Sequence, residues 1–257
     1  MKYNLKKSLL LIIVTGFFVS CASKKDIILF SEIKEGTENN IIYSFPKIQV
    51  NDILDVKITT INPETSLPYN TINVNSAAFS SIELLKLQGH LVSAEGKINL
   101  PILGPISASG KTTSELEKSI SSILESNGHL KNPSVSVRIL NAKVTVLGEV
   151  KSPGTYTYSE QTITLPQAIG YAGDITIEAN RKEVMLIREE EGMRKYHKID
   201  LTKSDWFNSP YYNIKQNDIV YVYPNNVKVK SAGFIGNTST VLSVFSILLT
   251  TFVLLTR

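Results

Sequence analysis

The two most apolar segments of the chain lie at its ends, and this placement constrains the fold more than any other feature. The first segment has lysines at positions 2, 6 and 7, then about a dozen mostly apolar residues, then Ser20 and Cys21. A basic start followed by an apolar run of this length is typical of a secretory signal peptide, and the run is too short to cross a bilayer. The sequence therefore predicts an exported protein in which residues 1–20 are a signal peptide. A buried N-terminal helix is the alternative.

The signal peptide also accounts for most of the positive charge. The formal net charge of the whole chain is +4. Residues 1–20 hold three lysines and no acidic residue, so the rest of the chain has 24 Lys and Arg against 23 Asp and Glu, a net +1. A near-neutral chain lacks the basic excess of a nucleic-acid-binding protein. The predicted partners therefore do not include nucleic acid.

Cys21 is the only cysteine, so it can form no intramolecular disulfide and no site of two or more cysteines. Phe18, Val19, Ser20 and Cys21 resemble a bacterial lipobox, which implies that Cys21 becomes the lipidated N-terminus of the mature chain. Acyl chains on Cys21 would hold the protein on a membrane leaflet, with residues 21–40 as a tether. No acidic residue stands beside the cysteine, which by analogy with sorting rules favours the outer membrane. An ordinary cleavage site beside an incidental thiol is the alternative.

The C-terminal segment is of a different kind. No charged residue lies between Lys230 and Arg257, and the stretch 239–256 is the most apolar part. The 17 residues 239–255 would form a helix roughly 25 Å long, which is short but sufficient for a thin bilayer. The sequence therefore predicts a transmembrane helix over 239–256, preceded by a linker over 227–238.

Hydroxyl side chains form a stripe on this predicted helix. Ser239, Ser243, Ser246 and Thr250 are spaced 4, 3 and 4 residues apart, which places them within about 60° of one another on a helix. A helix in lipid turns such groups toward a partner helix or a water-filled lumen. The stripe predicts that these four residues line an oligomeric pore. The alternatives are a lone anchor whose hydroxyls bond to their own backbone, and a buried core helix.

The polar middle of the chain predicts two β-rich units. In the first, alternation predicts strands over 47–60, with a turn or bulge at Asn51–Asp52, and over 134–140; a loop is expected over 62–81. A tight turn at Gly96 predicts a hairpin of 91–94 with 97–100, and 101–106 is expected to continue extended. Thr112 and Glu115 form a predicted capping box for a helix that ends near Gly128.

The second unit is expected to be a small β-grasp arrangement. Its predicted strands are 144–148, 155–158 and 218–224, with a hairpin of 183–188 and 193–199 and a short helix over 165–173. Most of the strands alternate in polarity, which indicates sheets with one solvated face. The fold class predicted for the whole chain is α+β.

Three motifs in these units resemble those of one family, the outer-membrane polysaccharide export proteins. The stretch 50–56 is similar to the GD-x-L-x-V strand of the export domain, with Asn51 in place of glycine. The stretches 96–104 and 110–117 resemble the G-x-I-x-L-P-x-L-G and G-x-T-x-x-E core of the same domain. The stretches 146–156 and 218–222 resemble the soluble-ligand-binding β-grasp domain.

The resemblance implies a division of the chain and a function. Residues 41–141 would be the polysaccharide export domain and 142–226 the β-grasp domain. Members of the family form rings, typically of eight subunits, that pass capsular or extracellular polysaccharide through helices in the outer membrane. An inner-membrane copolymerase delivers the polymer to the ring. Only one β-grasp unit is found here, where longer members have two, so a shorter periplasmic body is expected.

No pattern in the sequence predicts an enzyme, a cofactor or a metal site. His90, His129 and His197 lie in different segments, and no phosphate-binding or nucleophile motif is present. Glu189, Glu190 and Glu191 are expected to form a solvated hairpin tip rather than a catalytic pair. Trp206, Phe207, Tyr211 and Tyr212 are expected in the core or a subunit interface. The resemblance thus implies a passive export channel, and the alternative is a glycan- or partner-binding lipoprotein that lacks a pore.

Overall fold

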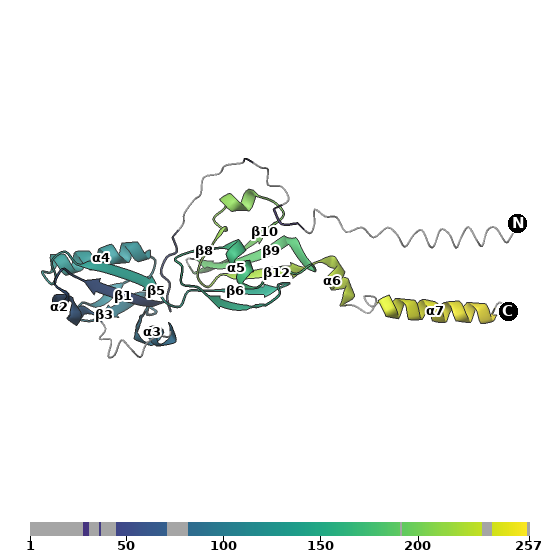
Figure 1. The fold of residues 1–257 in the computed structure, drawn as a ribbon, viewed down its shortest axis with the longest axis horizontal. Helices are drawn as coiled ribbons and strands as arrows, with labels where there is room; N and C mark the ends of the chain where they lie inside the picture. Colours follow the sequence, from purple (N-terminus) through teal and green to yellow (C-terminus); the bar gives the residue numbers. More distant parts are fainter. Residues whose placement is uncertain are drawn as a thin grey trace.

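The structure is a computed structural model, and it describes residues 28–30, 36, 45–70, 82–190, 192–232 and 238–255. The expected signal peptide, Cys21 and most of the expected tether lie outside these residues. The described chain is a mixed α and β fold with two small β-rich units, each with a hydrophobic core of its own. Figure 1 shows the two units side by side along the longest axis, with the C-terminal helices beyond the second.

The first unit is built on a three-stranded antiparallel sheet in the order β2-β1-β5. Its strands are β2 (His90–Leu91), β1 (Ile53–Thr59) and β5 (Ser134–Ile139). Every second residue of β1 is buried, beginning at Leu54, as the alternation predicted. The strand begins later than expected because Asn51 has a positive φ of 70° and turns the chain just before it. Asparagine takes this left-handed conformation more readily than most residues, which explains how it replaces the glycine of the motif.

The main helix of this unit is α4 (Thr113–Ser126), which packs beside β5. The predicted capping box is confirmed: the Thr112 hydroxyl accepts from the Glu115 amide, and the Glu115 carboxylate accepts from the Thr112 amide. Leu116, Ile120 and Leu124 are fully buried on the face toward the sheet. The helix ends as predicted before Gly128, whose φ is +69°.

Two local expectations for the first unit are wrong. The tight turn at Gly96 exists, but the segment before it supplies only β2, which pairs with β1. The hairpin is instead formed by β3 (Lys97–Leu100) and β4 (Gly104–Ser107), because the chain turns at 101–103 instead of continuing extended. The described part of the expected loop contains α2 (Pro63–Ser66) and the 3₁₀ turn η2 (Leu67–Tyr69), and it is followed by α3 (Ile82–Gln88).

The second unit is built on a five-stranded mixed sheet in the order β10-β9-β12-β6-β7. Its strands are β6 (Lys143–Gly148), β7 (Gly154–Thr157), β9 (Ala179–Glu190), β10 (Met193–Ile199) and β12 (Ile219–Pro224). The pair β12 and β6 is parallel, and the other pairs are antiparallel. The predicted β9–β10 hairpin is confirmed. The parallel pair of β12 and β6 therefore places the last strand of the unit beside its first strand.

Shorter elements close the core of the second unit. They are β8 (Ile163–Thr164), α5 (Leu165–Tyr171), the 3₁₀ turn η3 (Asp205–Asn208) and β11 (Asn213–Ile214). The helix α5 begins at a capping box of Thr164 and Gln167, with Pro166 in its first turn. Trp206 is buried in this core and stacks on Phe207 at 4.3 Å. Its predicted place in a core, not on a binding platform, is confirmed.

Two helices follow the second unit, α6 (Asn226–Ser231) and α7 (Thr238–Leu255). Lys228 of α6 forms an ion pair with Glu178 at 2.6 Å, which ties α6 to the second unit. The helix that the sequence predicts near the C-terminus is present as α7. Its expected role as a transmembrane segment is not supported: within the described residues, no helix has both the length and the apolarity to cross a membrane.

Candidate functional site

The two units are joined by hydrogen bonds between a turn of each. Asp52, in the turn before β1, accepts at its Oδ2 from the Gln216 side-chain amide at 2.5 Å and from the Gln49 backbone amide at 2.7 Å. Next to it, the Asn217 side-chain amide donates to Gln49 Oε1 at 3.0 Å. Gln216 and Asn217 lie in the turn between β11 and β12. These contacts hold the two units against each other.

Asp52 is an unusual group to find at such a junction. Its side chain is only 2 % exposed, and among the described residues no ion pair engages its carboxylate. Burial raises the pKa of Asp52 to about 6, although the hydrogen bonds from Gln49 and Gln216 act in the opposite direction. A buried carboxylate without a cation costs free energy when ionised, so the junction contains a built-in pH dependence.

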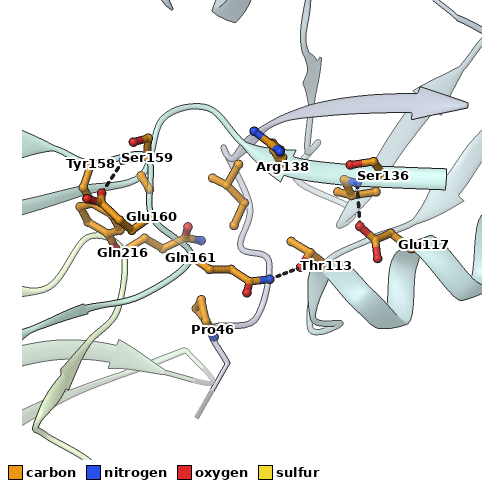
Figure 2. A pocket seen from close by; sticks show the side chains of 13 residues that line it. Pro46, Thr113, Glu117, Ser136, Arg138, Tyr158, Ser159, Glu160, Gln161 and Gln216 are labelled. Atoms are coloured by element: carbon orange, nitrogen blue, oxygen red, sulfur yellow. Dashed lines mark hydrogen bonds between the residues drawn. The ribbon is translucent and has the colours of Figure 1, made fainter. Parts of the chain in front are cut away.

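A crevice of about 420 Å³ opens beside this junction, with walls from both units (Figure 2). Its volume lies within the range of small-molecule sites, roughly 300–1,000 Å³. The first unit contributes the start of α4 and the outer edge of β5, and the second contributes the segment after β7. The lining residues are Pro46, Thr113, Glu117, Ser136, Val137, Arg138, Ile139, Ala142, Tyr158, Ser159, Glu160, Gln161 and Gln216.

Hydrogen bonds fix several of these side chains in place. Gln161 donates from its side-chain amide to the Thr113 hydroxyl at 3.0 Å, which is a second link between the units. Glu117 of α4 accepts from the Val137 backbone amide at 2.8 Å, at an edge of β5 that pairs with no strand among the described residues. Figure 2 shows both contacts at the walls of the crevice. The walls are therefore ordered without any ligand.

The floor of the crevice is buried and polar. Gln216 is 4 % exposed, and Thr113 and Tyr158 are each 7 % exposed. Burial, with the negative charge of Asp218 and Asp52, raises the pKa of Tyr158, so its hydroxyl keeps its proton at neutral pH. Within the described part of the chain, no hydrogen bond engages the Tyr158 hydroxyl. The crevice therefore offers a neutral hydroxyl at its base.

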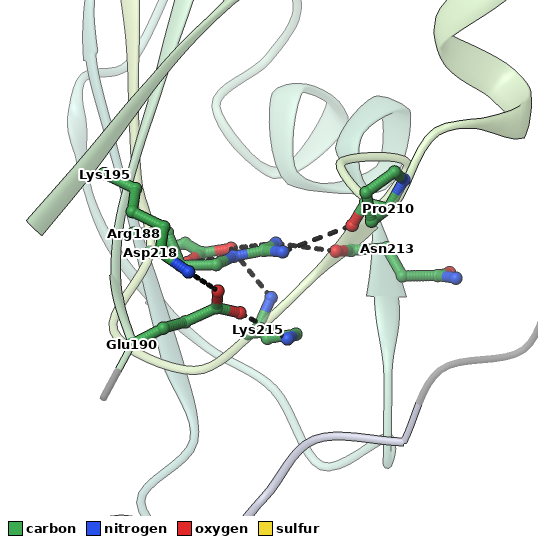
Figure 3. Close-up of polar contacts among 7 residues, drawn as sticks. All are labelled: Arg188, Glu190, Lys195, Pro210, Asn213, Lys215 and Asp218. Carbon is green, nitrogen blue, oxygen red and sulfur yellow. Dashed lines mark hydrogen bonds and ion pairs between the residues drawn. The ribbon is translucent and has the colours of Figure 1, made fainter. Parts of the chain in front are cut away.

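A second hollow, of about 900 Å³, lies between the first unit and the tip of the β9–β10 hairpin. Its charged residues on the hairpin side are tied to one another, as Figure 3 shows. Glu190 forms ion pairs with Lys215 at 2.5 Å and with Lys195 at 3.0 Å. The Lys215 contact lowers the pKa of Glu190 to about 2.

These contacts correct the expectation for the glutamates at the hairpin tip. Glu189 is exposed and pairs with Arg194, as a solvated tip requires. Glu190 is only 27 % exposed and its carboxylate is neutralised by two lysines, so it is not simply solvated. Glu191 lies outside the described residues. Neither described glutamate offers the free carboxylate that acid–base chemistry would use.

Beneath this network, Arg188 of β9 and Asp218 form a buried ion pair (Figure 3). The Arg188 guanidinium donates through Nε and Nη2 to both carboxylate oxygens, the shortest distance being 2.7 Å. It also donates to the carbonyl oxygens of Pro210 and Asn213. Arg188 therefore fixes the loop that leads to β11 and, through Asp218, the turn that carries Gln216. The ion pair supports the crevice without lining it.

The predicted pore-lining residues all lie on α7. Ser239, Ser243, Ser246 and Thr250 are exposed. The Ser243 hydroxyl donates to the Ser239 carbonyl oxygen at 2.8 Å, and the Thr250 hydroxyl donates to that of Ser246 at 2.7 Å. These bonds are the ones expected of an anchor helix whose hydroxyls bond to their own backbone. Hydroxyl oxygens still have acceptor capacity in this arrangement, so the bonds do not decide between anchor and lumen.

The three histidines do not come together. The His90 Nδ1 atom donates to the Asn99 carbonyl oxygen, His129 contacts Tyr69, and His197 stacks on Tyr211. Within the described residues, no group of three His, Cys, Asp or Glu side chains has the geometry to hold a metal ion.

The residues of the crevice were not predicted as site residues from the sequence. The sequence marks Asp52 only as part of a strand motif and of the expected turn or bulge, and it gives no signal for Gln161, Gln216 or Arg138. Asp52 and Gln216 are 164 residues apart in the chain, and each lies in or beside a turn, where polar residues are ordinary. Only the packing of the two units reveals that they meet.

Comparison with known proteins defines the class of this two-unit fold. Residues 44–140 match the profile of the polysaccharide biosynthesis/export protein family, and residues 142–222 match that of the SLBB domain. The boundary between the two matches falls where the chain passes from β5 to β6. The two units therefore correspond to a region similar to the export family and a region similar to the SLBB domain. With this pair of domains and the relatives below, the chain is similar to polysaccharide export proteins, two of which are named as outer membrane proteins.

This chain covers less than half of the length of each relative. The EPS I polysaccharide export outer membrane protein EpsA of Ralstonia nicotianae is 32% identical over 150 residues, which are 55% of this chain and 38% of that protein. The EpsA protein of Ralstonia solanacearum is 30% identical over 136 residues, 51% of this chain and 35% of that protein. The exopolysaccharide production protein ExoF of Rhizobium meliloti is 34% identical over 88 residues, 34% of this chain and 21% of that protein.

Proposed function

We propose that this chain is one subunit of a ring-shaped channel that exports capsular or extracellular polysaccharide across the outer membrane. The observation that carries the proposal is the tandem of matched domains, which covers residues 44–222 without interruption beyond one residue. The names of the relatives support polysaccharide export as the process. Conduction is passive in this proposal, and an inner-membrane copolymerase supplies the polymer.

In the ring, each subunit has two attachments. A lipid on Cys21 anchors the start of the mature chain to the membrane leaflet, and most of the chain lies in the periplasm. Copies of α7 gather around a common axis, with Ser239, Ser243, Ser246 and Thr250 toward a lumen. The apolar side chains of α7 support this arrangement, because Leu242, Phe245 and Ile247 are each more than half exposed in the single chain.

Deletion of the gene tests the export function directly. The expected result is loss of the surface polysaccharide with normal synthesis of the polymer, which then accumulates inside the cell envelope. Expression of the full chain restores export, and the Cys21→Ala variant does not, because it has no lipidation site. Normal surface polysaccharide in the deletion strain would contradict the proposal.

The alternative is a glycan- or partner-binding lipoprotein without a pore, and the hydroxyl bonds within α7 are compatible with it as well. Cysteine substitutions separate the two. Ser243→Cys and Thr250→Cys, each in a Cys21-lipidated chain, react with a water-borne thiol reagent if they line a lumen. Leu248→Cys, on the apolar face of the same helix, is the matched control and stays unlabelled. Equal protection of all three positions would support the anchor.

A further inference from the structure

The lining of the crevice between the two units has the chemistry of a carbohydrate site. Its accessible groups are hydroxyls, side-chain amides and carboxylates, with one guanidinium, contributed from both sides. Sugar hydroxyls both donate and accept, so they pair with amides, carboxylates and guanidinium groups alike. An apolar ligand would leave these polar groups unpaired, at a cost in free energy.

The crevice also has hydrogen-bonding groups that no protein partner uses. Within the described residues, no hydrogen bond or ion pair engages the Arg138 guanidinium, which projects from β5 at one wall, or the Tyr158 hydroxyl at the floor. The neighbouring groups are held in place by contacts between the units, as with Gln161 on Thr113 and Gln216 on Asp52. A ligand would therefore meet ordered amides beside the exposed Arg138 side chain, and binding would need little rearrangement of those amides.

The charges of the lining select the kind of sugar. Two carboxylates, Glu117 and Glu160, line the crevice together with a single guanidinium. An acidic sugar would gain one ion pair with Arg138 but would meet two like charges. A neutral sugar avoids this repulsion and can use the carboxylates as acceptors.

The rim is open, so the bound group need not be the end of a chain. Ser136, Ser159 and Gln161 on the rim are exposed, while Tyr158 and Gln216 below them are buried. We propose that the crevice binds a short neutral saccharide segment, such as part of the polymer in transit. The choice of ligand rests on the proposed export function; the site itself rests on the geometry.

Saturation-transfer difference NMR on the full chain in detergent tests the site. The probes are the methyl glycosides of glucose, galactose and N-acetylglucosamine, and glucuronic acid as the acidic comparison. The expected result is transfer to at least one neutral glycoside, with weaker transfer to glucuronic acid. Transfer to none of the neutral probes, or preference for glucuronic acid, would overturn the proposal.

Conservative variants locate the binding. Arg138→Gln and Tyr158→Phe each remove hydrogen-bonding groups and are expected to weaken the affinity about three- to tenfold. Arg194→Gln and Tyr223→Phe, on exposed side chains away from the crevice, are the matched controls and leave binding unchanged. Equal binding by all four variants places the sugar elsewhere and overturns the proposal. Circular dichroism confirms that each variant is folded before it is compared.

Failure of the saccharide site can be distinguished from failure of the proposed export function. Loss of surface polysaccharide in the deletion strain without glycoside binding keeps the export function and rejects the crevice as a sugar site. Glycoside binding at the crevice, together with normal export in the deletion strain, keeps the sugar site and rejects the export function.

Discussion

Two buried aspartates illustrate how single residues set the energetics of this molecule. Asp218 is buried against the guanidinium of Arg188, which donates to both of its oxygens. Asp52 is equally buried, but its hydrogen-bond partners, Gln216 and Gln49, are neutral. The negative charge of the carboxylate is therefore compensated at Asp218, whereas burial of the ionised carboxylate costs free energy at Asp52. Substitution at the two sites should shift the stability in opposite directions.

Asp52→Asn is expected to stabilise the chain at pH 7.5. The pKa of Asp52 is about 6 in the folded chain against 3.8 as the reference value, so the native state binds more protons between these values. Its contribution to stability therefore falls as the pH rises from about 4 to about 6 and stays low above that. The shift corresponds to at most about 3 kcal/mol. Asparagine accepts the same hydrogen bonds without ionising.

Urea unfolding at pH 7.5 and pH 4.5 measures this effect. The midpoint of the variant should exceed that of the wild type at pH 7.5, and the difference should shrink at pH 4.5. Asp55→Asn, on an exposed side chain of β1, is the matched control and should show no comparable change. A variant less stable than the wild type at pH 7.5 would contradict the assignment of a costly carboxylate.

Arg188→Met is expected to destabilise the chain by about 3–5 kcal/mol, because it leaves the Asp218 carboxylate buried without its cation. It also removes the donors to the carbonyl oxygens of Pro210 and Asn213. Arg194→Met is the control, since Arg194 is 60% exposed and pairs with a glutamate that is 65% exposed. Such a surface pair contributes little to stability, because water and salt screen it. Similar unfolding midpoints for the two variants would show that the buried ion pair contributes no more to stability than the surface pair.

Among the elements, the parallel pair of β6 and β12 depends on one glycine. Gly148 has a φ of +88°, and a Cβ atom at this position would lie 2.1 Å from the carbonyl oxygen of Val222. Both the backbone conformation and the close approach of β12 therefore require glycine. Gly148 lies at the end of β6, where the sheet of the second unit is closed by its last strand.

Gly148→Ala should destabilise the second unit by about 2–4 kcal/mol, because it adds backbone strain and forces two paired strands apart. Gly170→Ala is the control, since nothing lies within 4 Å of a Cβ at this helical position. Alanine there should be neutral or stabilise α5 by about 0.5–1 kcal/mol. Thermal unfolding measures the melting temperatures of the two variants. Equal melting temperatures would mean that β12 can move away from β6 at little cost.

The sequence predicts those elements whose signals are local. The helix α4 was predictable at both ends because its cap, apolar face and terminal glycine all lie within the element. The hairpin of β3 and β4 was missed because the turn at 101–103 includes Ile102, which has an unexpected positive φ of 64°. The helices α2 and α3 are short and their residues follow no clear helical period. Strand partners and the crevice depend on contacts between distant segments, for which the sequence has no local signal.

At the scale of the whole molecule, two closed cores are followed by a helix that belongs to neither. The core of the first unit draws on residues from Ile48 to Val137, and that of the second on residues from Ala142 to Val222. The helix α6 is held to the second unit through Lys228 and Glu178. The apolar side chains that the structure describes on α7 are exposed, and none of these contributes to either core. Folding of the units and association of the subunits should therefore be separable.

Removal of residues 238–257 tests this separation. The shortened chain retains both cores, the contacts of Asp52 with Gln216, and α6 with its ion pair. Its melting temperature should change by less than about 2 °C, because a loss of a fraction of a kcal/mol moves the transition of a domain of this size only slightly. Its mass in solution should be that of a monomer, whereas the full chain in detergent should form a larger particle of fixed mass.

A substitution within α7 controls for the deletion. Leu249→Lys in the full chain places a charge among the exposed apolar side chains without shortening the protein, and burial of this charge against a neighbouring subunit would be costly. It should therefore reduce association while leaving the melting temperature unchanged. Monomers from the full chain itself would refute an assembly through α7, and a marked fall in melting temperature after the deletion would show that α7 stabilises the units instead.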